Sequence, residues 1–202
     1  MRLINSSLEA EEREADVYNP LGRRLYVTDD ERRAFLEAAF EEPAHIRLFC
    51  YVIALTGCRL TEARRLTPAN FDPSLNLIVF ETLKRRRRGV FRHVPIPDDL
   101  SRALVSFIVP GSTCRLWSIS RSTGWRWIKR VMARAGVYGP QATTKGLRHG
   151  FGVTATQAHV PLSLVQRWLG HARLSTTVIY TSAFGPEERG FAERLWAVSS
   201  LD

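Results

Sequence analysis

Acidic residues are missing from a long part of this sequence: no Asp or Glu occurs from Leu100 to Pro186. Eleven Lys and Arg residues lie in the same stretch, and the 202-residue chain has a formal net charge of +9. Without carboxylates, this stretch cannot supply paired acids for catalysis or oxygen ligands for Ca²⁺ and Mg²⁺. Cations concentrated without acids are typical of polyanion-binding proteins, so we favour a nucleic acid as the partner over a surface that is merely basic.

Cysteines and long apolar runs are also scarce. The three cysteines, Cys50, Cys58 and Cys114, lack any Cys-x-x-Cys spacing, which argues against a disulfide framework and a structural zinc site. The longest apolar run, Leu48–Leu55, is much shorter than the roughly 18 residues of a membrane span. Acidic residues within positions 9–14 stand where a signal peptide would be apolar. We therefore expect a cytoplasmic, nucleoid-associated protein with no membrane partner.

The pattern of apolar residues predicts one mostly α-helical domain with a small antiparallel β-sheet, an α+β fold. A capping-box pattern at Thr28 and Glu31 marks the first helix, and the polar residues before it are expected to form a tail. Helices are expected over Asp29–Phe40, from Pro43 to Gly57, and over Leu60–Leu66, Asp98–Ile108, Ser120–Ala135, Thr144–Ala158, Pro161–Leu169, Ser175–Ser182 and Pro186–Val198. Strands are expected over Asn76–Thr82 and Phe91–Ile96, as a hairpin with a cationic tip.

His171 and Tyr180 can share a site despite their spacing. They are nine residues apart, so on one unbroken helix they would point to opposite faces. Gly170 is expected to end one helix and Ser175 to cap the next, which leaves His171 in the turn and lets the second helix carry Tyr180 back toward it. Taken singly, each residue is better explained by packing or capping.

Three cations stand where an anion could be held. Lys145 and Arg148 share one face of a helix near its N-terminus, where backbone N–H groups favour a phosphate. Arg59 follows an apolar helix and Gly57, which would hold it at the edge of the core, and Glu62 could orient it. A buried Arg indicates either a structural ion pair or an anion site, and the sequence leaves both open.

Lys84 is one of only three lysines beside 26 arginines, and it begins the cationic run of the expected hairpin. Unlike Arg, Lys can donate a proton when neighbouring cations and burial lower its pKa. Lys84 is therefore a candidate general acid, with chance placement in a solvated loop as the alternative.

Together these positions resemble the catalytic domain of the tyrosine recombinase (phage integrase) family across Thr28–Tyr180. Each fragment is short, but their order and spacing agree throughout. The matching pieces are Thr56-Gly57-Cys58-Arg59-Leu60-Thr61-Glu62, then Lys84 in its hairpin, Leu147-Arg148-His149, Leu169-Gly170-His171 and Thr176-Thr177-Val178-Ile179-Tyr180-Thr181.

The resemblance implies a site-specific recombinase that cleaves and rejoins DNA through Tyr180, which forms a 3′-phosphotyrosyl intermediate. It implies that Arg59 and Arg148 clamp the non-bridging oxygens and that His171 donates a further hydrogen bond to them. Lys84 would protonate the leaving 5′ oxygen. Because the phosphotyrosine conserves the bond energy, the resemblance implies no metal and no cofactor.

Two features depart from the family pattern. Most members have His three residues before the second Arg, where this sequence has Lys145; some type IB topoisomerases, which share this site plan, have Lys there. We hypothesise that Lys145 contacts the scissile phosphate, either as a base or as a phosphate ligand. Most members also have an N-terminal DNA-binding domain, whereas about 27 residues precede the domain here. The chain thus resembles small single-domain members such as the fimbrial phase-variation invertases.

The resemblance implies double-stranded DNA as the partner and a homo-oligomer, a tetramer, on that DNA, while a monomer is compatible with the free protein. DNA contact would fall to the hairpin tip and to the polar face of the helix Ser120–Ala135, opposite Trp125, Ile128 and Met132. The cations concerned are Arg85, Arg86, Arg87, Arg88, Arg126, Lys129, Arg130 and Arg134. For each of them singly, a solvated surface role is an equal alternative.

Three segments are expected: a tail over residues 1–27, a catalytic domain over residues 28–182 and a C-terminal helix within residues 183–202. In the last, Phe191, Leu195 and Trp196 share a face that either caps the chain's own core or docks on a neighbouring protomer. Two rival functions stay open: DNA relaxation of the type IB topoisomerase kind, and DNA binding by an inactive regulator. Integration, excision, inversion and resolution share one chemistry and are not separated by any residue.

Overall fold

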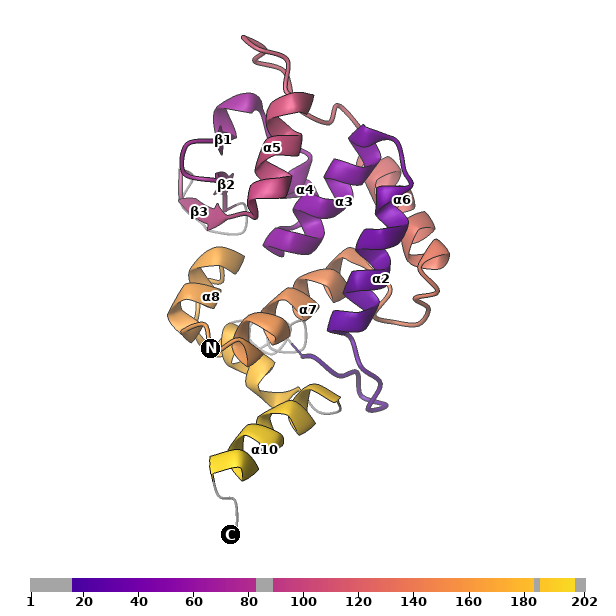
Figure 1. Ribbon diagram of the computed structural model, residues 1–202, viewed down its shortest axis with the longest axis vertical. Coiled ribbons are helices and arrows are strands. Elements are labelled where there is room, and N and C mark those ends of the chain that lie inside the picture. The colour runs from indigo at the N-terminus through magenta and orange to yellow at the C-terminus, as the bar shows by residue number, and fades with distance from the viewer. Residues whose placement is uncertain (1–15, 83–88, 184–185, 199–202) are drawn as a thin grey trace, which may run out of the picture.

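The protein is mostly helical, with one small antiparallel sheet. The computed structural model describes residues 16–82, 89–183 and 186–198, apart from the side chains of Pro186, Glu187, Glu188, Phe191 and Val198. Within these ranges the sheet has three strands in the order β1-β2-β3 and lies at the upper left in Figure 1. This architecture confirms the predicted fold class. In the same ranges, no helix is long and apolar enough to cross a membrane.

The helices and strands follow the predicted order. The first part contains α2 (Asp29–Phe40), α3 (Ala44–Thr56), α4 (Leu60–Ala63) and the 3-10 turn η1 (Pro68–Asn70), followed by the strands β1 (Phe71–Asp72), β2 (Leu77–Glu81) and β3 (Phe91–Pro95). The second part contains α5 (Asp98–Phe107), α6 (Arg121–Arg134), α7 (Thr144–Gln157), α8 (Leu162–Leu169), α9 (Ser175–Val178), the 3-10 turn η2 (Ile179–Ser182) and α10 (Pro186–Val198). Neither β1 nor η1 was predicted, and the predicted helix Ser175–Ser182 divides into α9 and η2.

Local signals in the sequence set the ends of the first helices. The hydroxyl of Thr28 accepts a hydrogen bond from the Glu31 amide, and the Glu31 carboxylate accepts one from the Thr28 amide, so the predicted capping box forms. Helix α3 is buried along most of its length and ends at Gly57, whose φ of 62° is left-handed. Glycine adopts this conformation at little cost, so the chain turns sharply and Arg59 follows at the edge of the core.

The core has two parts. The larger part lies between α2, α3, α5, α6 and the sheet. The smaller part packs Val17 and Tyr26 against α7, α8 and η2, and it includes Tyr180. Val17 and Tyr26 are fully buried, so residues 16–27 pack on the domain instead of forming the polar tail that was expected there. An irregular turn with no apolar periodicity brings them in, which is why the sequence pattern did not reveal it.

Helix α7 contains three glycines because three other parts of the chain approach its axis closely. A Cβ at Gly146 would lie 1.8 Å from the carbonyl oxygen of Gln141, and one at Gly150 would lie 2.3 Å from that of Val27. The glycines lower the helix propensity of the sequence, but they let α7 pack at the centre of the domain. Helix α10 extends away from this body in Figure 1.

Candidate active site

Arg148 is a buried cation with neutral hydrogen-bond partners. Its guanidinium, on α7, donates to the carbonyl oxygen of Gly57 at 2.8 Å and to that of Leu169 at 2.7 Å. Among the described residues, no carboxylate forms an ion pair with it. Burial and the nearby Arg59 lower the pKa of Arg148 to about 10, which leaves it charged at neutral pH. A buried charge without a counter-ion is costly, so the site favours an anion.

Arg59 lies beside this cation and is held by Glu62. The Arg59 guanidinium donates to Glu62 Oε1 at 2.9 Å, and the Arg59 amide donates to Glu62 Oε2 at 2.8 Å. Burial alone would raise the pKa of Glu62, but the guanidiniums of Arg92 and Arg59 hold it below its usual value. The Arg59 side chain is 25% exposed, so a ligand from outside can reach it. The predicted orienting role of Glu62 fits this geometry.

His171 lies in the turn after α8, as the sequence predicted, and it is neutral. Its Nδ1 is 2.9 Å from the hydroxyl of Thr177. Burial, with the charges of Arg148 and Arg59, lowers the pKa of His171 to about 2. If the Thr177 hydroxyl donates to Nδ1, the ring proton is on Nε2, which can then donate to an oxyanion. The sequence analysis gave Thr177 no role of its own.

Tyr180 returns to His171 through α9 and η2, as expected. Its ring stacks on the His171 ring with centroids 6.1 Å apart and planes at 25°. The side chain is 1% exposed, and burial raises the pKa of its phenol, although Arg148 and Arg59 act in the opposite direction. At rest the phenol is therefore protonated, and it lies within the field of both arginines.

His149 was part of the recognised pattern but was given no role. Its Nδ1 is 3.4 Å from the phenol oxygen of Tyr180, and its Nε2 is buried with no hydrogen-bond partner among the described residues. Burial, then the charges of Lys145 and Arg148, lower the pKa of His149 to about 3. The ring is thus a neutral group beside the phenol. Its place next to Arg148 was the only signal in the sequence.

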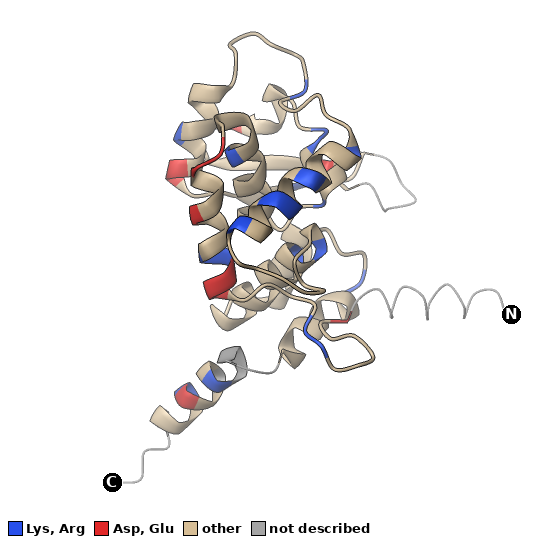
Figure 2. Ribbon diagram, turned by 90° about the vertical axis from the view of Figure 1, so that its right-hand side faces the viewer, with Lys and Arg blue, Asp and Glu red and all other residues tan. Residues whose placement is uncertain are grey.

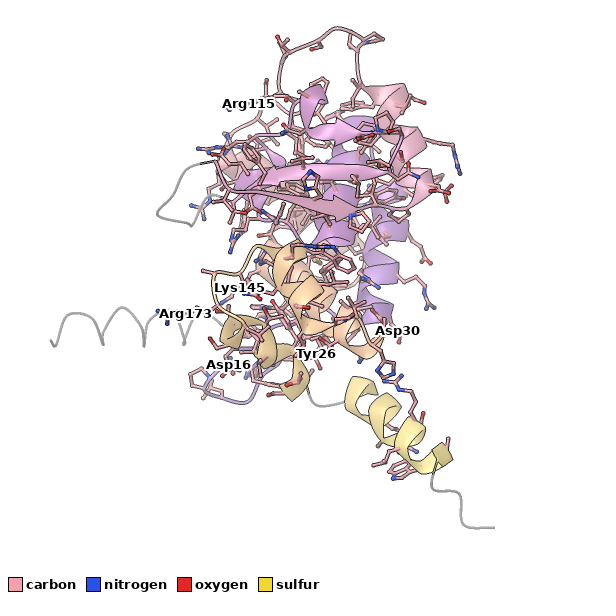
Figure 3. All side chains as sticks on the ribbon, turned by 90° about the vertical axis from the view of Figure 1, so that its left-hand side faces the viewer. Asp16, Tyr26, Asp30, Arg115, Lys145 and Arg173 are labelled. Atoms are coloured by element: carbon pink, nitrogen blue, oxygen red, sulfur yellow. The ribbon has the colours of Figure 1, made fainter. Side chains whose placement is uncertain are left out.

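Lys145 is exposed on the first turn of α7 and has no hydrogen-bond or ion-pair partner among the described residues. Figure 3 shows Lys145 and Arg173 on the same side of the molecule, below the sheet. Lys145 is close enough to His149 to influence its titration, so it borders the site without entering the buried part. Lys84 and the cations Arg85, Arg86, Arg87 and Arg88 lie outside the described residues.

Helix α6 presents a basic face, but two of its arginines are already paired. Figure 2 shows Lys and Arg recurring along this helix. Arg130 and Arg134 both form ion pairs with the buried Glu42, at 2.6 and 2.9 Å, and Lys129 donates to the carbonyl oxygen of Ala142. Arg126 is exposed, and within the described part of the chain its one polar contact is a long 3.4 Å approach to the hydroxyl of Thr123.

Trp125 was expected on the buried face of this helix, and this was wrong. The side chain is 48% exposed, whereas Ile128 and Met132 are buried as expected. Gly124, next to Trp125, faces the core instead, where a Cβ would lie 3.1 Å from the ring of Phe49. The helix therefore turns its smallest residue inward and leaves the indole beside the cations.

Metal ligands were not expected in this site. Among the described residues, no group of three or more His, Cys, Asp or Glu side chains is placed to hold a metal ion. The groups that do meet are two guanidiniums, two neutral imidazoles and a phenol, with Glu62 as the carboxylate that holds Arg59. Such a set can hold an anion and present a nucleophile to it.

The fold and this site together define the catalytic domain of a tyrosine recombinase. The model of the phage integrase family matches residues 26–185, and the chain belongs to this family. It is 25% identical over 188 residues to the tyrosine recombinase XerA of Pyrococcus furiosus, covering 87% of this chain and 63% of that protein. It is 35% identical over 150 residues to the tyrosine recombinase XerD of Brucella abortus, covering 66% and 46%. The chain thus spans less than two thirds of these relatives.

Solved structures share the fold. A crystal structure of XerA recombinase matches with a TM-score of 0.72 at 23% identity, over 88% of this chain and 65% of that one. The catalytic domain of bacteriophage HP1 integrase matches with a TM-score of 0.59 at 22% identity, over 87% and 96%. The chain thus shares the fold of almost the whole HP1 domain.

Proposed function

We propose that the chain cleaves and rejoins DNA at a specific site through a 3′-phosphotyrosyl intermediate on Tyr180. The observation that carries the proposal is the buried, charged Arg148, which forms no ion pair with any described carboxylate and lies beside Arg59, His171 and the Tyr180 phenol. A phosphodiester would supply the missing negative charge. A phosphodiester combines a single delocalised negative charge with a phosphorus atom that a phenol can attack.

The geometry supports one role for each group. Arg59 and Arg148 would bind the two non-bridging oxygens, and their charge would stabilise the pentavalent phosphate. His171, protonated on Nε2, would donate a further hydrogen bond. As the Tyr180 oxygen bonds to phosphorus, its phenolic proton would pass to His149 Nδ1, which lies 3.4 Å away. The bond to the 5′ oxygen breaks and that oxygen takes a proton, for which Lys84 remains our candidate donor.

Lys145 fits the role of a phosphate ligand better than that of a base. A base must contact the phenol, and His149 Nδ1 is the atom found there, at 3.4 Å. Lys145 is exposed and cationic at the rim, where it can reach a phosphate of the same strand. Of the two roles that the sequence left open for Lys145, phosphate ligand and base, this geometry favours the phosphate ligand.

We propose double-stranded DNA as the substrate and assembly of several copies on it. XerH, a site-specific recombinase with the same fold (TM-score 0.69, 21% identity), has been crystallised bound to its difH substrate. In this chain Leu195 and Trp196 of α10 are 65% and 55% exposed, so this helix does not bury them against its own core. We propose that α10 docks on a neighbouring protomer in a tetramer, and that the protein acts in the cytoplasm.

The test is incubation with DNA flanking the gene that encodes the protein, using nicked duplexes that trap the covalent intermediate. Wild-type protein is expected to form an adduct that survives denaturation. Tyr180→Phe, which keeps the buried ring, is expected to form none. Tyr138→Phe is the matched control, because Tyr138 is 70% exposed and its hydroxyl donates to the carbonyl oxygen of Ala133, not to a group of the site. Absence of an adduct with wild-type protein on every such duplex would refute the proposal.

Relaxation of the type IB topoisomerase kind is a second candidate, favoured by the lysine at residue 145. It predicts that the protein relaxes any supercoiled plasmid whatever its sequence. A site-specific recombinase relaxes or rearranges only plasmids that carry its site. An inactive DNA-binding regulator, the third candidate, predicts that Tyr180→Phe changes nothing.

A further inference from the structure

Arg92 is a second buried arginine of this region, and the sequence analysis overlooked it. It lies on β3, paired with Phe80 of β2, on the sheet face that also carries the buried Val94. Its side chain is 3% exposed, and the guanidinium carbon lies 4.9 Å from the centre of the Phe80 ring. A charge in this position is costly unless several partners satisfy it.

Three parts of the chain satisfy it. The Arg92 guanidinium donates to Glu62 Oε2 at 2.6 Å, to the carbonyl oxygen of Trp168 at 2.7 Å and to the hydroxyl of Thr82 at 3.3 Å. Gly170 is so close that a Cβ there would lie 3.1 Å from Arg92 Cδ. One side chain of the sheet therefore ties together α4, the end of α8 and the base of the hairpin.

Two of these partners, Glu62 and Trp168, connect Arg92 to the groups that would bind the phosphate. Glu62 is the carboxylate that holds Arg59. Trp168 precedes Leu169, whose carbonyl oxygen accepts from Arg148, and the same turn continues to His171. We propose that Arg92 is a positioning residue of the active site, which fixes Arg59 relative to the turn that carries His171. The inference rests on the proposed function, because it concerns the same phosphate site.

Arg92 also determines how much charge the site offers. Glu62 is one carboxylate shared by two guanidiniums, so the three groups together carry a net charge of +1. Without Arg92, Arg59 and Glu62 would form a neutral pair, and Arg59 would attract a phosphate less. The shared carboxylate thus keeps Arg59 oriented without neutralising the site.

The first test measures anion binding without any cleavage. The probe is inorganic phosphate at constant ionic strength, followed by NMR at the Arg59 Nε–H and the His171 ring. Arg92→Lys is the variant, because it keeps a cation beside Glu62 but cannot reach all three partners. We expect phosphate to bind about tenfold more weakly than to wild-type protein. Arg102→Lys, in an exposed ion pair with Asp99, is the matched control and should bind like wild type.

The second test measures cleavage of nicked duplexes with either a phosphodiester or a neutral methylphosphonate at the scissile position. Arg92→Lys is expected to slow phosphodiester cleavage about 100-fold, since a misplacement near 1 Å has this effect. On the methylphosphonate, which has one charged oxygen fewer to stabilise, the loss relative to wild type should be much smaller. A merely structural defect would lower both rates equally.

The outcomes separate the two proposals. Unchanged phosphate binding by Arg92→Lys, or equal losses on both duplexes, would overturn the role of Arg92. Weakened phosphate binding without any covalent adduct in the wild type would instead refute the proposed function and leave the role of Arg92 standing. If phosphate shifts neither resonance in the wild-type protein, both fail. Arg92→Met, with its melting temperature as a fold check, provides the more severe variant.

Discussion

Gly152 lies against the ring of Tyr180: a Cβ at residue 152 would stand 2.4 Å from Cε2 of the tyrosine. Real Cβ atoms do not approach aromatic carbons this closely, so the absence of a side chain at Gly152 makes room for the buried phenol. The next glycine toward the N-terminus, Gly150, makes room for backbone instead. The position of the nucleophile therefore depends on one specific glycine of α7.

Gly152→Ala is expected to push the Tyr180 ring out of its pocket. Overpacking of this kind costs about 1–3 kcal/mol of unfolding free energy, and covalent adduct formation should fall with it. Urea denaturation and the nicked-duplex assay measure the two effects. Gly190→Ala on α10 is the matched control, because nothing lies within 4 Å of a Cβ there. It should be neutral or slightly stabilising, by up to about 1 kcal/mol. Equal behaviour of the two variants would contradict this account of Gly152.

Stability should fall as the solution becomes acidic because of two buried histidines. Their pKa values of about 3 for His149 and about 2 for His171 lie below the usual 6.5 of an unfolded chain. Below pH 6.5 the unfolded state therefore binds protons that the folded state does not. Stability is fully present above that pH and is lost as the pH falls. From about pH 7 to about pH 5, each histidine should cost about 2 kcal/mol.

The measurement is urea denaturation of wild-type protein and His149→Gln at both pH values. The variant keeps a hydrogen-bond acceptor near the phenol but does not titrate. Its loss of stability should be smaller than that of the wild type by about 2 kcal/mol. His93→Gln, at an exposed residue of β3, is the control for the substitution itself. If wild type and His149→Gln lost the same unfolding free energy between the two pH values, the His149 imidazole would be protonated in the folded state.

Two substitutions of Lys145 distinguish a phosphate ligand from a base, because a ligand needs only the positive charge of this side chain. Arg keeps a permanent positive charge but cannot accept a proton, so a phosphate ligand tolerates Lys145→Arg and a base does not. We expect Lys145→Arg to retain most of the cleavage of a nicked duplex, and Lys145→Ala to lose about 10- to 100-fold. Unchanged cleavage by Lys145→Ala would remove the residue from the site altogether.

The pairing within α6 predicts unequal contributions to DNA binding. Arg126 has no ion pair with any described carboxylate and can bind a phosphate, whereas Arg134 already pairs with Glu42. Arg126→Ala should lower the slope of log affinity against log salt by about 0.9, the value for one phosphate contact. Arg134→Ala should change it less. Titrations of a labelled duplex at several salt concentrations give both slopes. Equal slopes for the two variants would mean that DNA breaks the pairs with Glu42.

Local signals explain why much of the fold was predictable. Helix ends depend on neighbouring residues, as at Thr28 with Glu31 and at Gly57, so the sequence showed them directly. The order of Arg59, Arg148, His171 and Tyr180 could likewise be recognised from short fragments. The structure brings these four residues to one place, and their catalytic roles remain predictions.

Long-range packing was not predictable in the same way. Successive residues of a strand point to opposite faces of the sheet, so Arg92 lies on the same face as Val94 and pairs with Phe80. This alternation was a signal in the sequence that could have predicted the burial of Arg92. Its partners, however, are up to 76 residues away, and no local pattern reveals them. The burial of Val17 also depends on distant residues, those of the cluster formed by α7, α8 and η2.

Because the Tyr180 phenol is buried, chemical modification can measure how often it becomes exposed in the free protein. Tyr180 is 1% exposed and Tyr138 is 70% exposed. A small reagent that nitrates tyrosine can therefore reach Tyr138 in every molecule, but it can reach Tyr180 only when the residues that cover Tyr180 move away. The ratio of the two nitration rates thus gives the fraction of time during which the nucleophile is uncovered. If DNA binding exposes Tyr180, added duplex DNA raises the nitration rate of Tyr180 relative to that of Tyr138. If thermal motion of α9 and η2 exposes it instead, the ratio stays the same.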